Sequence, residues 1–147
     1  MARPSAERLE VWRRWLLAQK VLIDRLDREL REQCDMTLED YDVLVQLAEQ
    51  PGARARMSDL ADALLIARSS CTRIVGRLED VGWVRRDPDA GDRRVVWATL
   101  TPTGRRRLRR AAVVHLNGVQ DAFARHLSAT DVDRLDVALD KILRAAE

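Results

Sequence analysis

Apolar residues recur every three or four positions over most of the chain, which is the spacing of amphipathic helices. The longest such stretch runs from about Ser5 to Cys34 without glycine or proline. It exceeds the ~10–14 residues of a typical globular helix. A chain of this size cannot bury so long a stripe on itself, so we expect this helix to pack against a partner chain. The stripe includes Trp12, Trp15, Leu16, Leu22, Ile23, Leu26 and Leu30.

Caps and breakers divide the rest of the chain into five shorter helices. Ser, Thr and Asp side chains accept hydrogen bonds from the first N–H groups of a helix, and glycine or proline ends one. The predicted helices begin at Thr37, at Ser58, at Ala67, at Thr101 with Pro102, and at Ser128 with Asp131. Their predicted breaks are Pro51-Gly52, Leu65-Ile66 and Gly82. The inward positions of the fifth helix are Leu108, Ala112, His115, Leu116, Val119 and Phe123.

Two short strands are expected between the fourth and fifth helices. Trp83-Val84 is followed by the turn residues Pro88-Asp89-Ala90-Gly91, and Val95 to Leu100 alternates with the period of a strand. Arg54 to Met57 is the candidate for a small strand at the sheet edge. The predicted fold class is therefore mainly α with a small β-hairpin.

The predicted fourth helix has an apolar face and a polar, basic face. Its inward residues are Cys71, Ile74, Val75, Leu78 and Val81. Its outer residues are Arg68, Ser69, Thr72, Arg73, Gly76 and Arg77. The hairpin that follows has Asp92-Arg93-Arg94 at its tip. A basic helix followed by a basic hairpin is the layout of a winged helix-turn-helix, which binds double-stranded DNA.

Charge is unevenly distributed along the chain. Residues 54–110 hold 14 arginines and 7 acidic residues, a net charge of +7, whereas the rest of the chain has a net charge of −5. This distribution favours a nucleic-acid partner for the central segment. A GC-rich genome is the alternative explanation for the excess of arginine over lysine, but it does not explain why the acidic residues lie elsewhere.

Several classes of protein are disfavoured by the same sequence. No apolar run is long enough to span a membrane, and the start lacks the apolar stretch of a secretory signal, so we expect a cytoplasmic protein. Two cysteines and two histidines without ligand spacing predict no metal and no cofactor. No catalytic constellation is present, so an enzyme is not expected.

Six short segments together resemble the MarR family of bacterial transcription regulators. The specific part is the Asp-x-Arg of the hairpin followed by Leu-Thr-x-x-Gly. One departure is Ala67, where the family usually has a capping Ser or Asp at the start of the recognition helix. The segments are Tyr41–Leu44, Met57–Ala61, Arg68–Arg73, Leu78–Val84, Asp92–Arg94 and Leu100–Gly104.

The resemblance implies a winged helix-turn-helix at residues 37–100, flanked by dimerisation helices at residues 1–36 and 101–147. It also implies an obligate homodimer that reads a pseudo-palindromic operator as a repressor. A small molecule, often an aromatic acid, would release the DNA from a pocket between the dimer helices and the winged modules. A winged-helix module that binds a protein partner is the alternative, but such a module needs no basic face.

Candidate DNA contacts lie on the predicted recognition helix and hairpin. An arginine at position 73 can pair bidentately with guanine in the major groove. In the family, the arginine at the wing tip enters the minor groove. Arg94 resembles that arginine, and Asp92 would orient it. A merely solvated helix face and an ordinary surface turn are the alternatives. The remaining candidates are Arg68, Ser69, Ser70, Thr72, Arg77 and Arg93.

Three other groups have open roles. Arg105, Arg106, Arg107, Arg109 and Arg110 either contact phosphates or pair with acidic dimer helices. An aromatic effector could stack on Trp12 or Trp15 with its carboxylate on Arg14, beside Tyr41 and His115, although a dimer-core role for the tryptophans is favoured. Oxidation of Cys71, beneath the recognition helix, would provide a redox switch, and the alternative is a small core residue.

Overall fold

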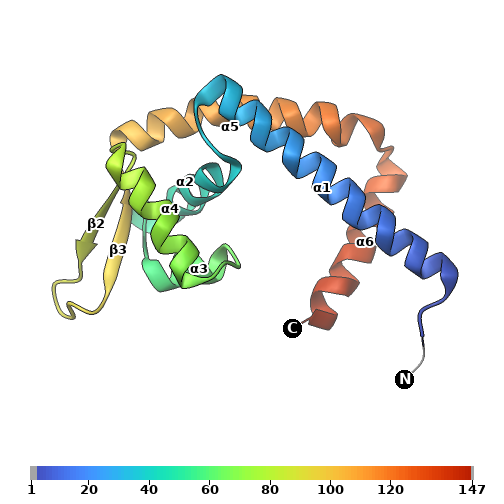
Figure 1. Cartoon of the computed structure of the whole chain (residues 1–147), viewed down its shortest axis with the longest axis horizontal. Helices are drawn as coiled ribbons and strands as arrows, with labels where there is room; N and C mark the ends of the chain where they lie inside the picture. Colours follow the sequence, from blue (N-terminus) through green and yellow to red (C-terminus); the bar gives the residue numbers. More distant parts are fainter. Residues whose placement is uncertain (1–2, 147) are drawn as a thin grey trace.

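The computed structural model describes residues 3–146, within which the chain forms six α-helices and one small antiparallel sheet (Figure 1). The prediction of a mainly α fold with a β-hairpin is confirmed. The elements are α1 (Ala6–Cys34), α2 (Leu38–Glu49), η1 (Pro51–Ala53), β1 (Arg54–Arg56), α3 (Met57–Ala63), α4 (Arg68–Asp80), β2 (Val84–Pro88), β3 (Val96–Leu100), α5 (Pro102–Ala122), η2 (Ala124–His126) and α6 (Ala129–Ala146).

Most helix starts follow the predicted capping residues. Thr37 accepts a hydrogen bond from the Asp40 N–H, and the Asp40 carboxylate accepts one from the Thr37 N–H, which is a complete capping box. Thr101 accepts from the Gly104 N–H at the start of α5. Ser128 and Asp131 form the same reciprocal pair before α6. Gly82 follows α4 with φ +76°, a left-handed conformation that suits glycine.

Four predicted positions are wrong. Ser58 does not cap α3, because β1 continues to Arg56 and the helix begins directly after it at Met57. Val81 was expected inward, but α4 ends at Asp80 and Val81 is exposed. Leu116 on α5 and Phe123, the residue that follows α5, were also expected inward, but they are 62% and 40% exposed in the single chain.

The sheet has the order β1-β3-β2, with both pairs antiparallel. Arg54 to Arg56 is therefore an edge strand, as predicted, and β2 and β3 form the hairpin. The hairpin projects from the body of the molecule beside α4 (Figure 1). Residues 89–95 connect its strands and form the wing tip.

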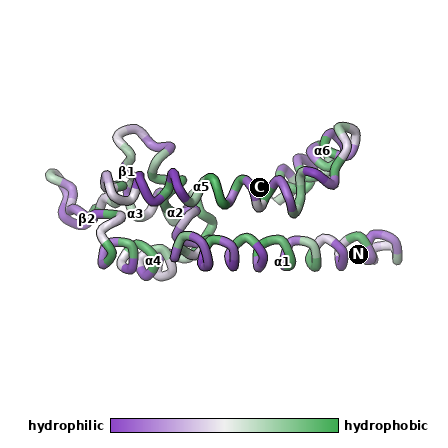
Figure 2. Tube along the Cα trace, turned by 90° about the horizontal axis from the view of Figure 1, so that it is seen from above, coloured by the Kyte–Doolittle hydropathy of each residue, from purple (hydrophilic) through white to green (hydrophobic). Residues whose placement is uncertain are grey.

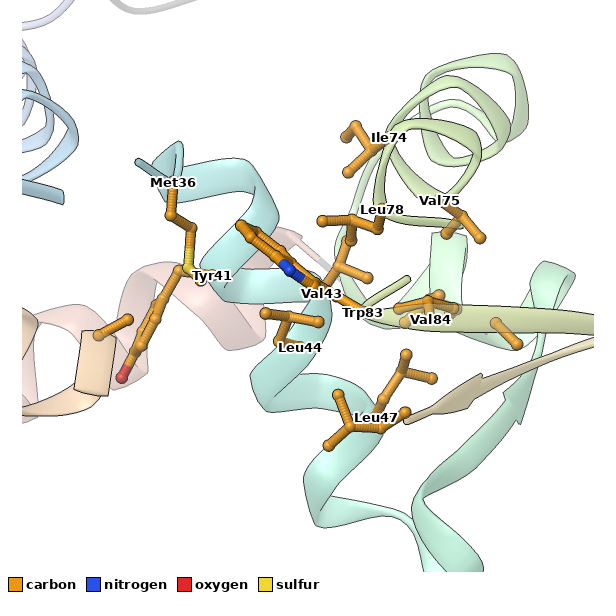
Figure 3. Close-up of a cluster of buried hydrophobic side chains, with 14 of the residues drawn as sticks. Met36, Tyr41, Val43, Leu44, Leu47, Ile74, Val75, Leu78, Trp83 and Val84 are labelled. Atoms are coloured by element: carbon orange, nitrogen blue, oxygen red, sulfur yellow. The ribbon is translucent and has the colours of Figure 1, made fainter. Parts of the chain in front are cut away.

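The core lies under α2, α4 and the base of the hairpin (Figure 3). The last turns of α1 close it from one side through Leu30 and Cys34, both buried. The fully buried side chains include Leu44, Leu47, Leu60, Ile74, Val75, Leu78 and Val84. This packing fixes which face of α4 points outward.

The other helices leave this compact part of the molecule as two arms, one from α1 and one from the end of α5 with α6 (Figures 1 and 2). Every residue from Ala6 to Val21 is exposed in the single chain, including Trp12 and Trp15 at 55% and 41%. No residue of α6 is buried. None of the helices within residues 3–146 combines the length and apolar character needed to cross a membrane.

Candidate nucleic-acid interface

Helix α4 presents the predicted polar face to solvent. Arg68, Ser69, Thr72 and Arg73 are exposed, whereas Ser70 and Arg77 are half-buried. Ala67 occupies the N-cap position and supplies no side-chain hydrogen bond, so the first N–H groups of α4 lack a side-chain cap. Such N–H groups, together with the helix dipole, favour an anion at this end of the helix.

A cleft of about 420 Å³ lies between the start of α4 and the wing. It brings Arg68 and Thr72 of α4 together with Arg94 of the wing tip, three of the predicted contacts. It also contains Arg56 and Arg86, which sequence reasoning missed. The strand register is the signal that could have found them. Arg56 pairs with Trp97 and Arg86 pairs with Ala98, which are neighbouring residues of β3. None of the residues that line this cleft is acidic.

Arg86 attaches the wing to the recognition helix. Its Nη2 lies 2.9 Å from Glu79 Oε1, and its backbone N–H donates to Glu79 Oε2 at 2.8 Å. These hydrogen bonds lower the pKa of Glu79 and raise that of Arg86, so both groups stay charged. These contacts therefore join the hairpin to the last turn of α4.

Aspartates keep the wing tip in shape. The Asp92 carboxylate accepts from Arg94 Nε at 3.1 Å and from Arg94 Nη2 at 3.0 Å, the pairing that the sequence suggested. Asp89, which sequence reasoning missed, accepts from Trp97 Nε1 at 2.7 Å and from the N–H groups of Gly91 and Asp92. These donors lower the pKa of both carboxyl groups. Arg93 is exposed beside them.

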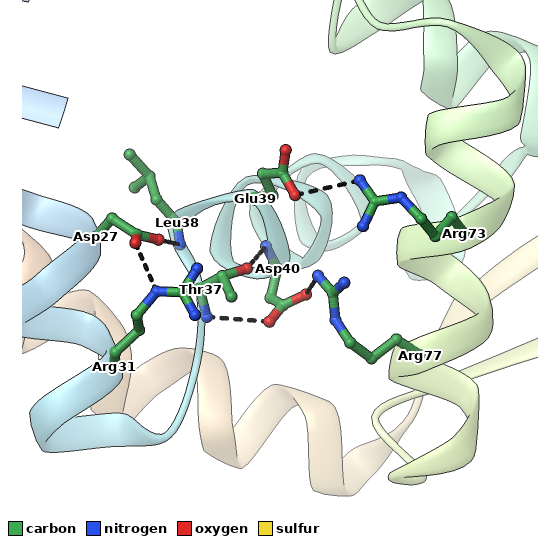
Figure 4. A network of polar contacts seen from close by, with 8 residues as sticks. All are labelled: Asp27, Arg31, Thr37, Leu38, Glu39, Asp40, Arg73 and Arg77. Carbon is green, nitrogen blue, oxygen red and sulfur yellow. Dashed lines mark hydrogen bonds and ion pairs between the residues drawn. The ribbon is translucent and has the colours of Figure 1, made fainter. Parts of the chain in front are cut away.

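The two arginines farther along α4 face the start of α2 (Figure 4). Arg73 Nη2 lies 3.6 Å from Glu39 Oε2, with both side chains more than half exposed. Arg77 Nη2 donates to Asp40 Oδ1 at 2.5 Å, and Asp40 is only 5% exposed. Arg77 is thus already bound within the protein, whereas Arg73 has a weak surface partner.

The arginine run at the start of α5 is partly used inside the fold. Arg107 donates to the Cys34 carbonyl at 2.8 Å and lies 4.7 Å from the centre of the Trp83 ring. Arg110 donates to the Gln33 carbonyl at 3.2 Å. Both arginines bind backbone carbonyls in the last turn of α1. Neither contact involves an acidic side chain, and phosphate contact by the exposed arginines of the run stays a prediction.

The effector candidates form two separate groups in the single chain. Tyr41 and His115 stack with ring centres 4.5 Å apart, and His115 Nδ1 is buried without a hydrogen-bond partner. Burial lowers the pKa of His115. Trp15 instead lines an apolar groove of about 590 Å³ beside Phe123 and Leu135. Trp12 and Arg14 lie on the exposed part of α1, where Arg14 pairs with Glu10.

Cys71 lies on the buried face of α4 and is 1% exposed, and this burial raises the pKa of its thiol. A buried thiol with a raised pKa is a poor nucleophile toward oxidants, because the thiolate is the reactive form. Within residues 3–146, no group of three or more His, Cys, Asp or Glu side chains is arranged to hold a metal ion.

Comparison with known proteins agrees with this geometry. A family model described as "MarR family" matches residues 35–95, the segment from α2 to the wing. The transcriptional repressor MprA of Escherichia coli K12 is 30% identical over 126 residues, which cover 85% of this chain and 70% of MprA. The chain belongs to the MarR family.

Other MarR family relatives match over different lengths. The regulator PecS of Dickeya dadantii is 32% identical over 105 residues, and the match covers 71% of this chain but only 63% of PecS. Sco3205, a MarR family transcriptional regulator from Streptomyces coelicolor solved in complex with DNA, is 36% identical with a TM-score of 0.93. That match covers 99% of this MarR family chain and 94% of Sco3205. The predicted winged helix-turn-helix fold and the family resemblance are confirmed.

Proposed function

We propose that this MarR family protein is a homodimeric, sequence-specific DNA-binding transcriptional regulator that acts as a repressor. The observation that supports it most is the cleft between α4 and the wing, where Arg56, Arg68, Arg86 and Arg94 meet without an acidic lining residue. Phosphate groups bind such clustered guanidinium groups and the uncapped start of a helix. The relative Sco3205 was solved in complex with DNA, which agrees with this assignment.

In this proposal α4 enters the major groove and the wing lies over the adjacent minor groove. Ser69, Ser70, Thr72 and Arg73 read or position the major-groove edges. Arg94, with Arg93 beside it, reaches the minor groove while Asp92 holds its guanidinium in place. The side chain of Arg94 is 91% exposed, so DNA can approach it without rearrangement of the fold.

A second copy of the chain would cover the apolar arms. Trp12, Leu17, Leu116 and Ile142 are all exposed large apolar side chains on α1, α5 and α6. An uncovered apolar surface of this extent marks an interface. The apolar groove at Trp15, Phe123 and Leu135 is where a partner helix would pack. Two recognition helices related by a two-fold axis would read a pseudo-palindrome.

A small-molecule effector would release the DNA from the region between these arms and the winged module. The Tyr41–His115 stack supports this part of the proposal, because an aromatic ring pair beside an unpartnered ring nitrogen suits an aromatic acid. The burial of Cys71 favours this ligand response over the redox alternative.

The experiment is fluorescence anisotropy with the intergenic duplex upstream of the protein's own gene and a shuffled duplex at the same salt. Preferential binding to the native duplex is expected. Arg94→Ala should weaken it by about 1–3 kcal/mol and reduce the salt dependence by roughly one counterion, because a cation at the DNA is lost. The dimer should persist by size-exclusion chromatography. Equal, salt-independent binding of both duplexes would favour the protein-interaction alternative.

A further inference from the structure

Two ion pairs join α2 and α4. The Arg77–Asp40 pair contains a buried carboxylate, whereas both side chains of the Arg73–Glu39 pair are exposed. Asp40 is the only charged residue among the buried side chains of residues 3–146. A buried carboxylate is tolerated only when its oxygens are paired. Asp40 meets this requirement through the Thr37 N–H at 3.0 Å and the Arg77 guanidinium at 2.5 Å (Figure 4).

The same network continues from α2 to the dimer helix α1. The Asp27 carboxylate on α1 accepts from the Leu38 N–H at 2.8 Å, at the first residue of α2. Arg31 holds that carboxylate from the next turn of α1, with Nε 2.6 Å from Asp27 Oδ2. Asp27, the start of α2 and Arg77 therefore form a continuous polar connection from α1 to the recognition helix (Figure 4).

The position of Arg77 on α4 gives this connection a consequence for DNA recognition. Consecutive helical residues are rotated by about 100° about the helix axis, so Arg77 and Glu79 point to nearly opposite sides. Arg77 is held by α2, and Glu79 is held by Arg86 of the wing. The apolar face of α4 is already buried in the core, and these two attachments on opposite sides further restrain its rotation and the direction in which Arg73 and Thr72 point.

We propose that Asp40 and Arg77 are positioning residues for DNA recognition, which set the orientation of α4 while Arg73 makes the contact. This inference rests on the proposed function and replaces the expectation that Arg77 itself contacts DNA. Arg77 is half-buried, and its partner Asp40 is only 5% exposed. Arg73 has an exposed partner, Glu39, that a phosphate or base can replace at little cost.

The test is a double-mutant cycle read by anisotropy on the native duplex over a series of salt concentrations. Arg77→Met and Asp40→Asn should each weaken binding by about tenfold, and the double variant should be no weaker than the weaker single one, because both remove the same interaction. The slope of log K against log salt should stay at the wild-type value, since no phosphate contact is lost. Asp140→Asn, which breaks the exposed Asp140–Arg144 pair of α6, is the matched control.

A direct contact by Arg77 would give different results. Arg77→Met would then lower the salt slope by roughly one contact, and Asp40→Asn would tighten binding because it releases the guanidinium. Either result, or wild-type affinity in both variants, would overturn the inference. If Asp40→Asn does not fold by circular dichroism, the salt slope of Arg77→Met alone decides. Wild-type protein that fails to prefer the native duplex would instead contradict the proposed function.

Discussion

The arginines of the basic cleft differ in what holds them, and this difference assigns them different tasks. Arg94 pairs with Asp92 on the surface, an interaction worth about 0–1 kcal/mol, and its side chain remains 91% exposed. Arg86 donates hydrogen bonds to Glu79 from both its side chain and its backbone N–H, so it keeps the wing attached to α4. In the proposed function the exposed Arg94 therefore contacts DNA, and the half-buried Arg86 maintains the geometry.

Some of these residues could be found from the sequence and others could not. Arg94 and Asp92 were identifiable because both lie in one turn. Asp89 and Arg86 were missed, since their roles depend on Trp97 and Glu79, which the fold brings to them from other elements. The exposed face of α4 was predictable from its period, but the partner of Arg77 lies 37 residues away on α2.

His115 gives a prediction about pH. Burial lowers its pKa in the folded state below the usual 6.5, so the unfolded chain takes up a proton first as the pH falls. Stability should therefore decrease as the pH drops from above 6.5 toward the lowered pKa. Thermal melts at pH 7.5 and 5.5 should show a lower melting temperature at pH 5.5. His115→Phe should reduce that difference, and an unchanged difference would mean that other groups cause it.

At the scale of elements, the chain joins its helices through close backbone contacts as well as side chains. Thr101 donates its N–H to the Trp83 carbonyl at 3.0 Å and its hydroxyl to the Gly82 carbonyl at 2.7 Å. A Cβ at Gly104 would overlap the Trp83 carbonyl, so only glycine allows α5 to pass there. This is a physical reason for the Leu-Thr-x-x-Gly pattern, which places the first turn of α5 against the end of the recognition helix.

Arg107 tests whether the arginine run on α5 serves the fold or the DNA. Its hydrogen bond to the Cys34 carbonyl stabilises the negative end of the α1 dipole. Arg107→Met should lower stability by about 1 kcal/mol, roughly 3 °C in melting temperature, and leave the salt slope of DNA binding unchanged. Arg109→Met, on the exposed side of the same helix, should leave the melting temperature unchanged. A lower salt slope in Arg107→Met would show a phosphate contact instead.

Helix boundaries followed the sequence closely where a side chain caps the helix, as at Thr37, Thr101 and Ser128. They failed at Ser58, because the pairing of β1 with β3 decides where α3 begins. Local signals could not show this, since the strand partner lies about 40 residues farther along the chain. The same limit applies to Leu116 and Phe123. Their helical spacing predicted which side of the helix they lie on, but it could not show whether another element packs against that side.

In the whole molecule, the single chain leaves two apolar arms uncovered, and a second copy covers them in the proposed homodimer. The winged module packs around one core that the end of α1 helps to close, whereas the arms expose apolar residues from Leu9 to Ile23 on α1 and from Val132 to Leu143 on α6. The sequence indicated this for the first helix, because its stripe was too long for the chain to cover. The polar connection from Asp27 to Arg77 links α1 to α4 through the start of α2, and the hydrogen bond of Arg107 to the Cys34 carbonyl joins α5 to α1.

The central claim is that two copies place two recognition helices and two wings on one operator. Hydroxyl-radical footprinting of the native duplex tests it most directly. Two protected regions related by a two-fold axis are expected, with centres about one helical turn apart and minor-groove protection outside each. A single asymmetric footprint would contradict the paired arrangement, and protection that is identical on a shuffled duplex would contradict sequence-specific recognition.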